Sequence, residues 1–231
     1  MVDKVQVFLS NLNFSQKKSE KKVHIADYPP DTFVRSNKSL SFKGNIPKII
    51  PVSYNFLRGD LPREDFLEDY LLEELQKKGV NTIISLTTGL RKSFVDKIQK
   101  LGFTHHIFDF TEDIDPSPEE VKRFLKIFDD PNVVAFTHCR EGINRTGLMT
   151  AIYNVCKRDY NFRNAYTDML KRGYKYNDHP NMREFLKQIC IAQGKEKVED
   201  IDKAILDLSS LEQRNSNMRT FRNSTTLIVA E

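Results

Sequence analysis

Cysteine is scarce in this sequence: only three occur among 231 residues, at positions 139, 156 and 190. An odd number at irregular spacing matches neither a disulfide framework nor a zinc-binding pattern. No apolar run approaches the roughly 20 residues that a helix needs to cross a bilayer. The first residues also lack the basic region and long apolar run of a secretory signal. We therefore expect a protein that is neither secreted nor inserted in a membrane.

An excess of one charge is also missing, because 36 Lys and Arg residues face 32 Asp and Glu, a net charge of +4. This mild balance suits anionic substrates and does not by itself indicate nucleic-acid binding. Apolar residues make up 39% of the chain, enough for one sizeable core with extensions. We expect a polar N-terminal extension over residues 1–45, one domain over 46–193, and a charged, helical or loose C-terminal tail over 194–231.

One decapeptide, residues 138–147, reads His-Cys-Arg-Glu-Gly-Ile-Asn-Arg-Thr-Gly. The apolar run 133–136 precedes it, and apolar residues at helical spacing follow from Leu148. This context predicts a strand, a tight loop and a helix. Such a turn directs backbone N–H groups and a helix N-terminus into one concavity, which favours an anion.

The same turn places a thiol and a guanidinium together, at Cys139 and Arg145. A positive field favours the thiolate form of Cys139, and a guanidinium fork can bind two phosphate oxygens at once. A nucleophile, an oxyanion cradle and a phosphate clamp therefore occupy one loop. This combination indicates covalent phosphoryl transfer to sulfur.

With its His-Cys, five intervening residues, Arg and Thr, the decapeptide resembles the signature of the cysteine-dependent protein-tyrosine and dual-specificity phosphatases. The resemblance implies that Cys139 is the nucleophile, that Thr146 assists phosphocysteine breakdown and that His138 orients the loop. It also implies a phosphate-binding loop formed by Arg140, Glu141, Gly142, Ile143, Asn144 and Arg145.

Within that superfamily, the segment 144–147, Asn-Arg-Thr-Gly, is similar to the branch that contains RNA 5'-triphosphatases, the capping-enzyme domains and a baculoviral phosphatase. Residues 83–88 with Arg91, and residues 54–59, also resemble that branch. The chain departs from it at Arg140 and Glu141, where the branch has Thr-His. A carboxylate at position 141 disfavours a very highly charged substrate.

A general acid would speed the departure of an alkoxide or phenoxide leaving group. The segment before the helix that starts at Ser117 contains four candidates: Asp109, Glu112, Asp113 and Asp115. We favour Asp113, because Glu-Asp-x-x-Pro resembles the acid loop of some dual-specificity and lipid phosphatases, with Asp109 as the second choice. The alternative is that these acidic residues only complement the helix dipole.

Three functions remain open: a phosphatase acting on phosphotyrosine and possibly phosphoserine or phosphothreonine proteins, an RNA 5'-tri- or diphosphatase, and a phosphate-binding module without turnover. Asn144 favours RNA, whereas the acidic segment favours phosphate esters. A phosphoinositide is less favoured, because the loop has Arg140 but no lysine and includes Glu141. The basic and aromatic string 171–176 is interpreted as a helix end rather than a nucleic-acid surface.

No cofactor or metal is expected, since the loop and Arg145 neutralise the phosphate and the other histidines lack ligand spacing. Cys139 requires a reducing compartment, which predicts the cytoplasm or nucleus. Cys156 and Cys190 are expected in the core, and a monomer is the default.

The order of apolar runs predicts a single α/β domain with a central, mostly parallel sheet flanked by helices. We expect a helix opening at residues 60–62 with Phe66, Leu67, Tyr70, Leu71 and Leu75 on its apolar face. Strands are predicted over 80–86 and 103–110, with a short helix between them that ends near residue 102, and another strand is predicted from residue 133. A capping box at 117–120 should open a helix through residue 128. Further helices are expected near 147–159, 163–172, 180–193 and 197–212.

Overall fold

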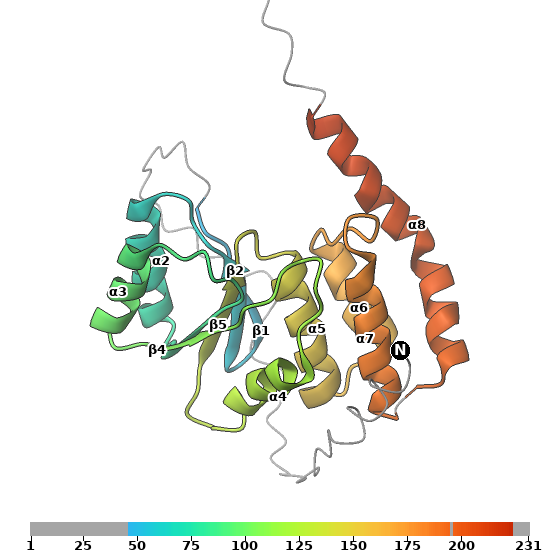
Figure 1. Cartoon of the computed structure of the whole chain (residues 1–231), viewed down its shortest axis with the longest axis horizontal. Helices are drawn as coiled ribbons and strands as arrows, with labels where there is room; N and C mark the ends of the chain where they lie inside the picture. The colour runs from blue at the N-terminus through green and yellow to red at the C-terminus, as the bar shows by residue number, and fades with distance from the viewer. Residues whose placement is uncertain (1–45, 195, 224–231) are drawn as a thin grey trace, which may run out of the picture.

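The computed structural model describes residues 46–194 and 196–223, the last six of them by their backbone alone. The expected N-terminal extension, residues 1–45, and the end of the C-terminal tail lie outside the described residues. Between them, the chain forms one mixed sheet flanked by helices on both faces (Figure 1). The predicted fold class is confirmed.

The sheet has five strands in the order β1-β2-β5-β3-β4. Its β1–β2 pair is antiparallel, and the β2–β5, β5–β3 and β3–β4 pairs are parallel. The strands are β1 (Ile49–Ser53), β2 (Phe56–Asp60), β3 (Thr82–Ser85), β4 (Thr104–Ile107) and β5 (Ala135–Cys139). The strand that leads into the decapeptide is therefore the central one, and its carboxyl end is flanked by the ends of β2 and β3.

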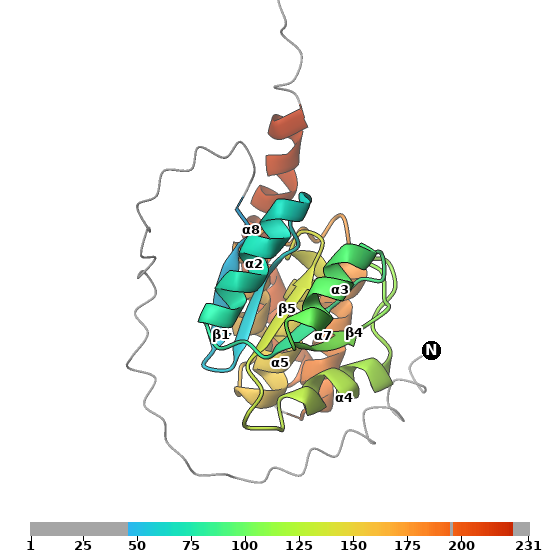
Figure 2. The same cartoon turned by 90° about the vertical axis from the view of Figure 1, so that its left-hand side faces the viewer.

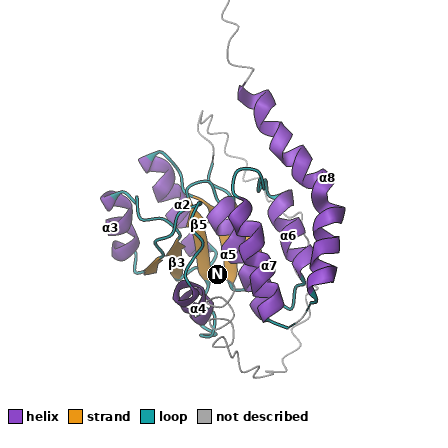
Figure 3. Ribbon diagram, turned by 45° about the vertical axis from the view of Figure 1, so that its right-hand side comes forward, coloured by secondary structure: helices purple, strands orange, loops and turns teal. Residues whose placement is uncertain are grey.

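Two helical layers cover the sheet (Figure 2). One face carries α2 (Asp65–Lys77) and α3 (Lys92–Lys100), whose apolar side chains meet Ile83 and Phe136 in a smaller core. The larger core lies under the second layer (Figure 3). On that side α5 (Asn144–Lys157) lies against the sheet beside α4 (Pro118–Ile127), α6 (Phe162–Lys171) and α7 (Pro180–Ala192) pack on α5, and the long α8 (Val198–Asn223) packs on α6.

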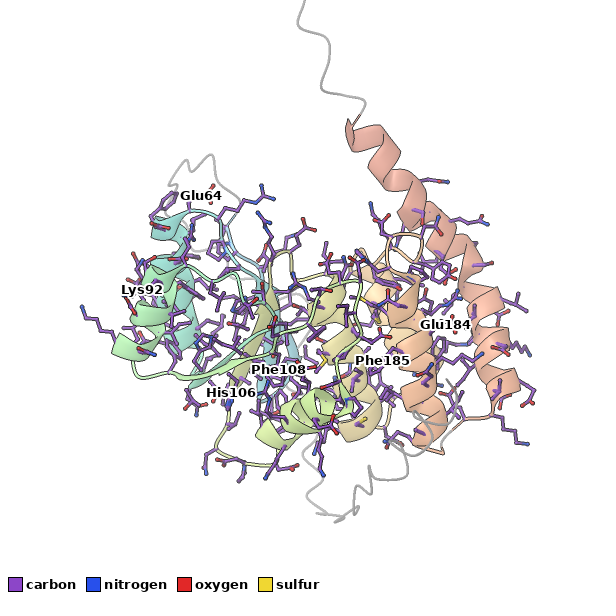
Figure 4. The ribbon with its side chains drawn as sticks, viewed as in Figure 1. Glu64, Lys92, His106, Phe108, Glu184 and Phe185 are labelled. Carbon is purple, nitrogen blue, oxygen red and sulfur yellow. The ribbon has the colours of Figure 1, made fainter. Side chains whose placement is uncertain are left out.

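Side chains follow these layers (Figure 4). Phe108, just after β4, is fully buried in the larger core, and Phe185 of α7 packs against that core. Lys92, in the first turn of α3, and Glu64, just before α2, are exposed on the α2–α3 side of the domain. Cys190 is buried and Cys156 is partly buried against the same core, which confirms their expected placement.

The capping box predicted for α4 is present. Ser117 accepts a hydrogen bond from the Glu120 N–H through its side chain at 3.2 Å, and the Glu120 carboxylate accepts one from the Ser117 N–H at 2.7 Å. Two orphan donors of the helix are satisfied in this way, and Pro118 supplies a preset first turn.

The prediction for the first helix was wrong in two respects. Residue 60 still belongs to β2, where it pairs with Cys139 of β5, so the chain turns before α2 begins at Asp65. The buried stripe of α2 is formed by Leu67, Leu71, Leu72 and Leu75. Phe66 and Tyr70 lie one position earlier in each turn and remain 52% and 43% exposed.

Other boundaries moved less. The central strand β5 begins at Ala135 instead of residue 133. Strand β4 covers only residues 104–107 of the expected 103–110. The helix after the decapeptide starts at Asn144, earlier than expected, and the C-terminal helix continues to Asn223. Because α5 begins at Asn144, the last four residues of the decapeptide, 144–147, lie in its first turn.

Candidate active site

Cys139 is the last residue of β5 and is fully buried at the head of α5. Ser117 caps α4 and Asn161 caps α6, but no side chain caps the N-terminus of α5 and its first turn holds no acidic residue. The N–H groups of this turn and the positive end of the helix dipole are therefore available to an anion beside the thiol.

The loop between Cys139 and α5 depends on Gly142. Its φ is +67°, and a Cβ built on it would lie 2.5 Å from the carbonyl oxygen of Gly59. The left-handed conformation and the close approach to β2 both require glycine. Arg140 and Glu141 are exposed at the tip, and the Arg140 carbonyl accepts a hydrogen bond from the Leu61 N–H at 3.3 Å. The loop is thus tied to the end of β2.

Arg145 lies in the first turn of α5 with its guanidinium under the loop. Its Nη1 donates to the carbonyl oxygen of Leu86 at 2.9 Å, which anchors one side of the fork. Its Nε is buried without a hydrogen-bond partner among the described residues and lies 3.8 Å from Oε1 of Glu112. A desolvated donor without a hydrogen-bond acceptor is costly, so this edge of the fork is suited to donate to an incoming oxyanion.

His138 supports the loop from inside the sheet. Its Nδ1 lies 3.3 Å from the Cys139 carbonyl oxygen, and its Nε2 lies 2.8 Å from the Ser85 hydroxyl. Burial lowers the pKa of His138 to about 4, so the ring is neutral at physiological pH. The predicted orienting role of His138 is compatible with these contacts, because both ring nitrogens are engaged.

The remaining signature residues differ in exposure. Thr146 is fully buried, and its hydroxyl has no hydrogen-bond partner among the described residues. Ile143 and Asn144 are half-buried at the turn into α5. The Ile143 side chain packs close to Gly173, in the segment that joins α6 to α7. The connection after α6 therefore forms one wall of the site.

The four acidic candidates lie in the loop that joins β4 to α4, and the structure separates them. Asp109 is exposed, and Asp115 is half-buried with a pKa that burial raises. Asp113 is 87% exposed and lies 3.6 Å from Nδ1 of His179. Glu112 lies 3.8 Å from Arg145 and is closer to the clamp than the sequence indicates. The choice of Asp113 as the general acid stays a prediction.

The start of α7 holds this acidic loop. The His179 Nε2 lies 3.2 Å from a Glu112 carboxylate oxygen. The Asn181 side-chain amide donates to the Asp115 carboxylate at 2.9 Å and to the Glu112 carbonyl at 3.3 Å. Both residues lie in a segment that the sequence marks only as a turn, so their contact with the acidic loop was not predicted.

A third residue missed in the sequence is Arg58 of β2. Its side chain is 2% exposed, and its Nη2 donates to the Gly142 carbonyl at 2.7 Å, inside the signature loop. The signal was an arginine in the middle of a strand that is otherwise buried, since a buried charge needs a specific partner.

Within the described ranges, no group of three or more His, Cys, Asp or Glu side chains is placed to hold a metal ion. No helix in the same ranges is long and apolar enough to cross a membrane.

A thiol at the head of an uncapped helix, with an arginine clamp in the same loop, defines the class of cysteine-dependent phosphatases. Residues 52–184, more than half of the chain, match the family described as "DSP-PTPase phosphatase fused to NAD+ Kinase". The chain belongs to this family of dual-specificity-type phosphatases, within the cysteine-dependent protein-tyrosine phosphatase superfamily.

Curated relatives agree with this assignment. The chain is 28% identical to the dual specificity protein phosphatase CDC14A of Mus musculus over 131 residues, which cover 53% of this chain and 21% of the relative. It is 33% identical to CDC14C of Homo sapiens over 84 residues, covering 36% and 18%. The aligned part thus spans about a fifth of the length of these relatives.

Solved structures share the fold. The core catalytic domain of the S. cerevisiae PP-IP phosphatase SIW14 aligns with a TM-score of 0.52 and 12% identity, over 72% of this chain and 96% of that domain. TpbA of P. aeruginosa aligns with a TM-score of 0.51 and 18% identity, over 70% and 90%.

Proposed function

We propose that this protein hydrolyses phosphate monoesters on proteins, phosphotyrosine first and phosphoserine or phosphothreonine as well, through a phosphocysteine at Cys139. In the first step the thiolate sulfur bonds to phosphorus while the ester P–O bond breaks, and the leaving oxygen receives a proton from an acid. In the second step water attacks phosphorus and gives a proton to the conjugate base of that acid, the P–S bond breaks, and inorganic phosphate leaves while the thiolate is restored.

The Nε of Arg145, which has no hydrogen-bond acceptor among the described residues, carries this proposal. The other side of the same guanidinium is anchored at Leu86, and the N-terminus of α5 beside it has no cap. Two fixed sources of positive potential therefore converge next to the thiol. The transition state of phosphoryl transfer places charge on the equatorial oxygens, which such donors stabilise.

A phosphoprotein substrate is supported by the acidic loop and by the relatives. Glu112 and Asp113 lie at the mouth of the site, where a carboxylate can supply the proton that a tyrosine or serine oxygen needs on leaving. Negative charge there opposes a substrate with several phosphates. The relatives reported above are named dual specificity protein phosphatases.

The experiment compares a phosphotyrosine peptide with a triphosphate-ended RNA on the same enzyme preparation. We expect release of phosphate from the peptide, loss of turnover in Cys139→Ser with the peptide still bound, and about a hundredfold lower kcat in Asp113→Asn. Asp96→Asn, which removes an exposed carboxylate from α3, is the matched control. Phosphatase activity that persists in Cys139→Ser would overturn the mechanism.

The second candidate, an RNA 5'-phosphatase, is favoured by Asn144 and by the resemblance of the segment 144–147. An anhydride has a leaving group that needs little or no proton. Faster turnover of the RNA than of the peptide, with full activity in Asp113→Asn, would select this function. Binding of the peptide without turnover of either substrate would select the module that only binds phosphate.

A further inference from the structure

A separate cavity of about 220 Å³ lies beside the edge strand β1, between the end of α5 and α6. Its polar lining comes from α5, the turn after it, and α6: Asn154, Arg158, Tyr160, Asp168 and Arg172. None of these residues belongs to the signature loop or the acidic loop. The cavity is therefore distinct from the site of phosphoryl transfer.

Hydrogen-bond donors outnumber acceptors in this cavity. Arg172 donates through Nε to both carboxylate oxygens of Asp168, each at 3.0 Å. Arg158 donates through Nη1 to the Val52 carbonyl at 2.6 Å and to the Asn154 side chain at 3.2 Å. These hydrogen bonds use Nη1 of Arg158 and Nε of Arg172, and each planar guanidinium carries further N–H donors. Planar donors of this kind match the oxygens of a phosphate.

Behind the cavity lies a third guanidinium, Arg58. Its Nη1 is buried without a hydrogen-bond partner and lies 3.9 Å from Oδ2 of Asp168. Burial and then the charge of Arg172 lower the pKa of Arg58 to about 10, despite the opposing effect of Asp168. The Asp168 carboxylate thus lies close to two guanidinium groups, those of Arg58 and Arg172. Arg158 lines the same cavity, so three positive charges are balanced by one negative charge.

We propose that this cavity binds a phosphate-type oxyanion between Arg158 and Arg172, and that its occupancy is transmitted to the catalytic loop through Arg58. The path is short. An anion bound to Arg172 would weaken the ion pair between Arg172 and Asp168. The Asp168 carboxylate could then interact more strongly with Arg58. The other nitrogen of Arg58 already donates to the Gly142 carbonyl at 2.7 Å. The cavity and the signature loop are therefore joined by one buried side chain.

The test is a titration of the full chain with inorganic phosphate, followed by NMR signals of the arginine Nε–H groups. We expect saturable shifts of Arg158 and Arg172 in addition to those of the catalytic loop. Arg172→Gln and Arg158→Gln should each weaken the cavity event at least tenfold and leave the catalytic-loop event in place. Arg163→Gln, which removes an exposed charge from the same helix α6, is the matched control.

Arg172→Lys guards against misfolding, because it keeps the charge and loses the fork, and it should bind with intermediate affinity. Only one saturable event, lost in Arg145→Met, would overturn the proposal.

Kinetics test the coupling: phosphate bound at Cys139 competes with substrate and raises KM, whereas phosphate in the cavity should also lower kcat by a factor of about two or more. That part should disappear in Arg172→Gln. An unchanged kcat with the cavity occupied would overturn the coupling.

The oxyanion could be a second phosphate of the substrate or free phosphate, and a comparison of two peptide substrates distinguishes these sources. If the cavity takes a second phosphate of the substrate, Arg172→Gln should raise KM for a doubly phosphorylated peptide and leave KM for the singly phosphorylated one unchanged. If it takes free phosphate, both peptides should respond alike. Because turnover of the singly phosphorylated peptide is measured in the same series, failure of the cavity proposal is distinguishable from failure of the proposed function.

Discussion

The hydroxyl of Ser85 and Nε2 of His138 are 2.8 Å apart, and the direction of this hydrogen bond follows from the partner of the other ring nitrogen. The Cys139 carbonyl, 3.3 Å from Nδ1, can only accept, so Nδ1 donates and Nε2 accepts from Ser85. Ser85 in turn accepts from Nε2 of His105, also at 2.8 Å. β5 is thus linked through Ser85 of β3 to His105 of β4 by two hydrogen bonds, each donated in the direction of His138.

Replacing Ser85 with alanine should loosen this brace. Nε2 of His138 would remain buried without a donor, which costs about 1–3 kcal/mol. We expect the free energy of unfolding in urea to fall by that amount and kcat/KM on a phosphotyrosine peptide to fall with it. Ser93→Ala, at an exposed position of α3, should change both by little. Equal stability and activity in Ser85→Ala and the parent would contradict the role of this contact.

The buried ring of His138 predicts a dependence of stability on pH. Its pKa is lowered from 6.5 to about 4 by burial, so the unfolded chain takes up this proton at higher pH than the folded one. The contribution of the neutral His138 ring to the free energy of unfolding is fully present above pH 6.5. It falls by up to about 3 kcal/mol as the pH decreases from 6.5 toward 4. NMR titration of the His138 ring should show it neutral at pH 5. A midpoint near 6.5 would contradict the burial argument.

Sequence patterns were most informative where one segment contains the whole signal. The capping box at Ser117 and the turn from β5 into α5 are local, so both could be predicted from residue order. The brace from His138 through Ser85 to His105 joins three strands that are distant in sequence, and only their register brings the side chains together.

The same reason explains the contacts that were missed around the acidic loop and behind the signature loop. His179 meets Glu112 because the start of α7 returns to the acidic loop after three intervening helices, α4, α5 and α6. Arg58 reaches Gly142 because β2 is the neighbour of β5. Spacing along the chain does not identify the partner in either contact.

Gly142 should not tolerate a side chain. Alanine there would have φ near +67° and a Cβ 2.5 Å from the Gly59 carbonyl oxygen, against backbone that cannot yield easily. We expect a loss of more than about 1 kcal/mol in stability, because the strained backbone adds to the clash. The loop must also shift, so kcat/KM should fall at least tenfold.

Gly89→Ala is the matched control for this change, because no atom lies within 4 Å of its added Cβ. The Gly89 variant should keep both stability and kcat/KM. If Gly142→Ala kept its full kcat/KM, the loop would not require the conformation described here.

Glu112 should weaken substrate binding through Arg145. Its carboxylate lies 3.8 Å from the unpaired Nε, where it occupies part of the positive field that a phosphate dianion must use. Glu112→Gln removes this competing charge, so KM for a phosphotyrosine peptide should fall by about two- to tenfold, the range expected for a partly exposed ion pair. Glu119→Gln, an exposed change at the start of α4, should leave KM unaltered. A higher KM in Glu112→Gln would mean that this carboxylate instead holds Arg145 in the orientation that binds phosphate. A steady-state assay at low ionic strength separates the two cases, because screening of the charges is weakest there.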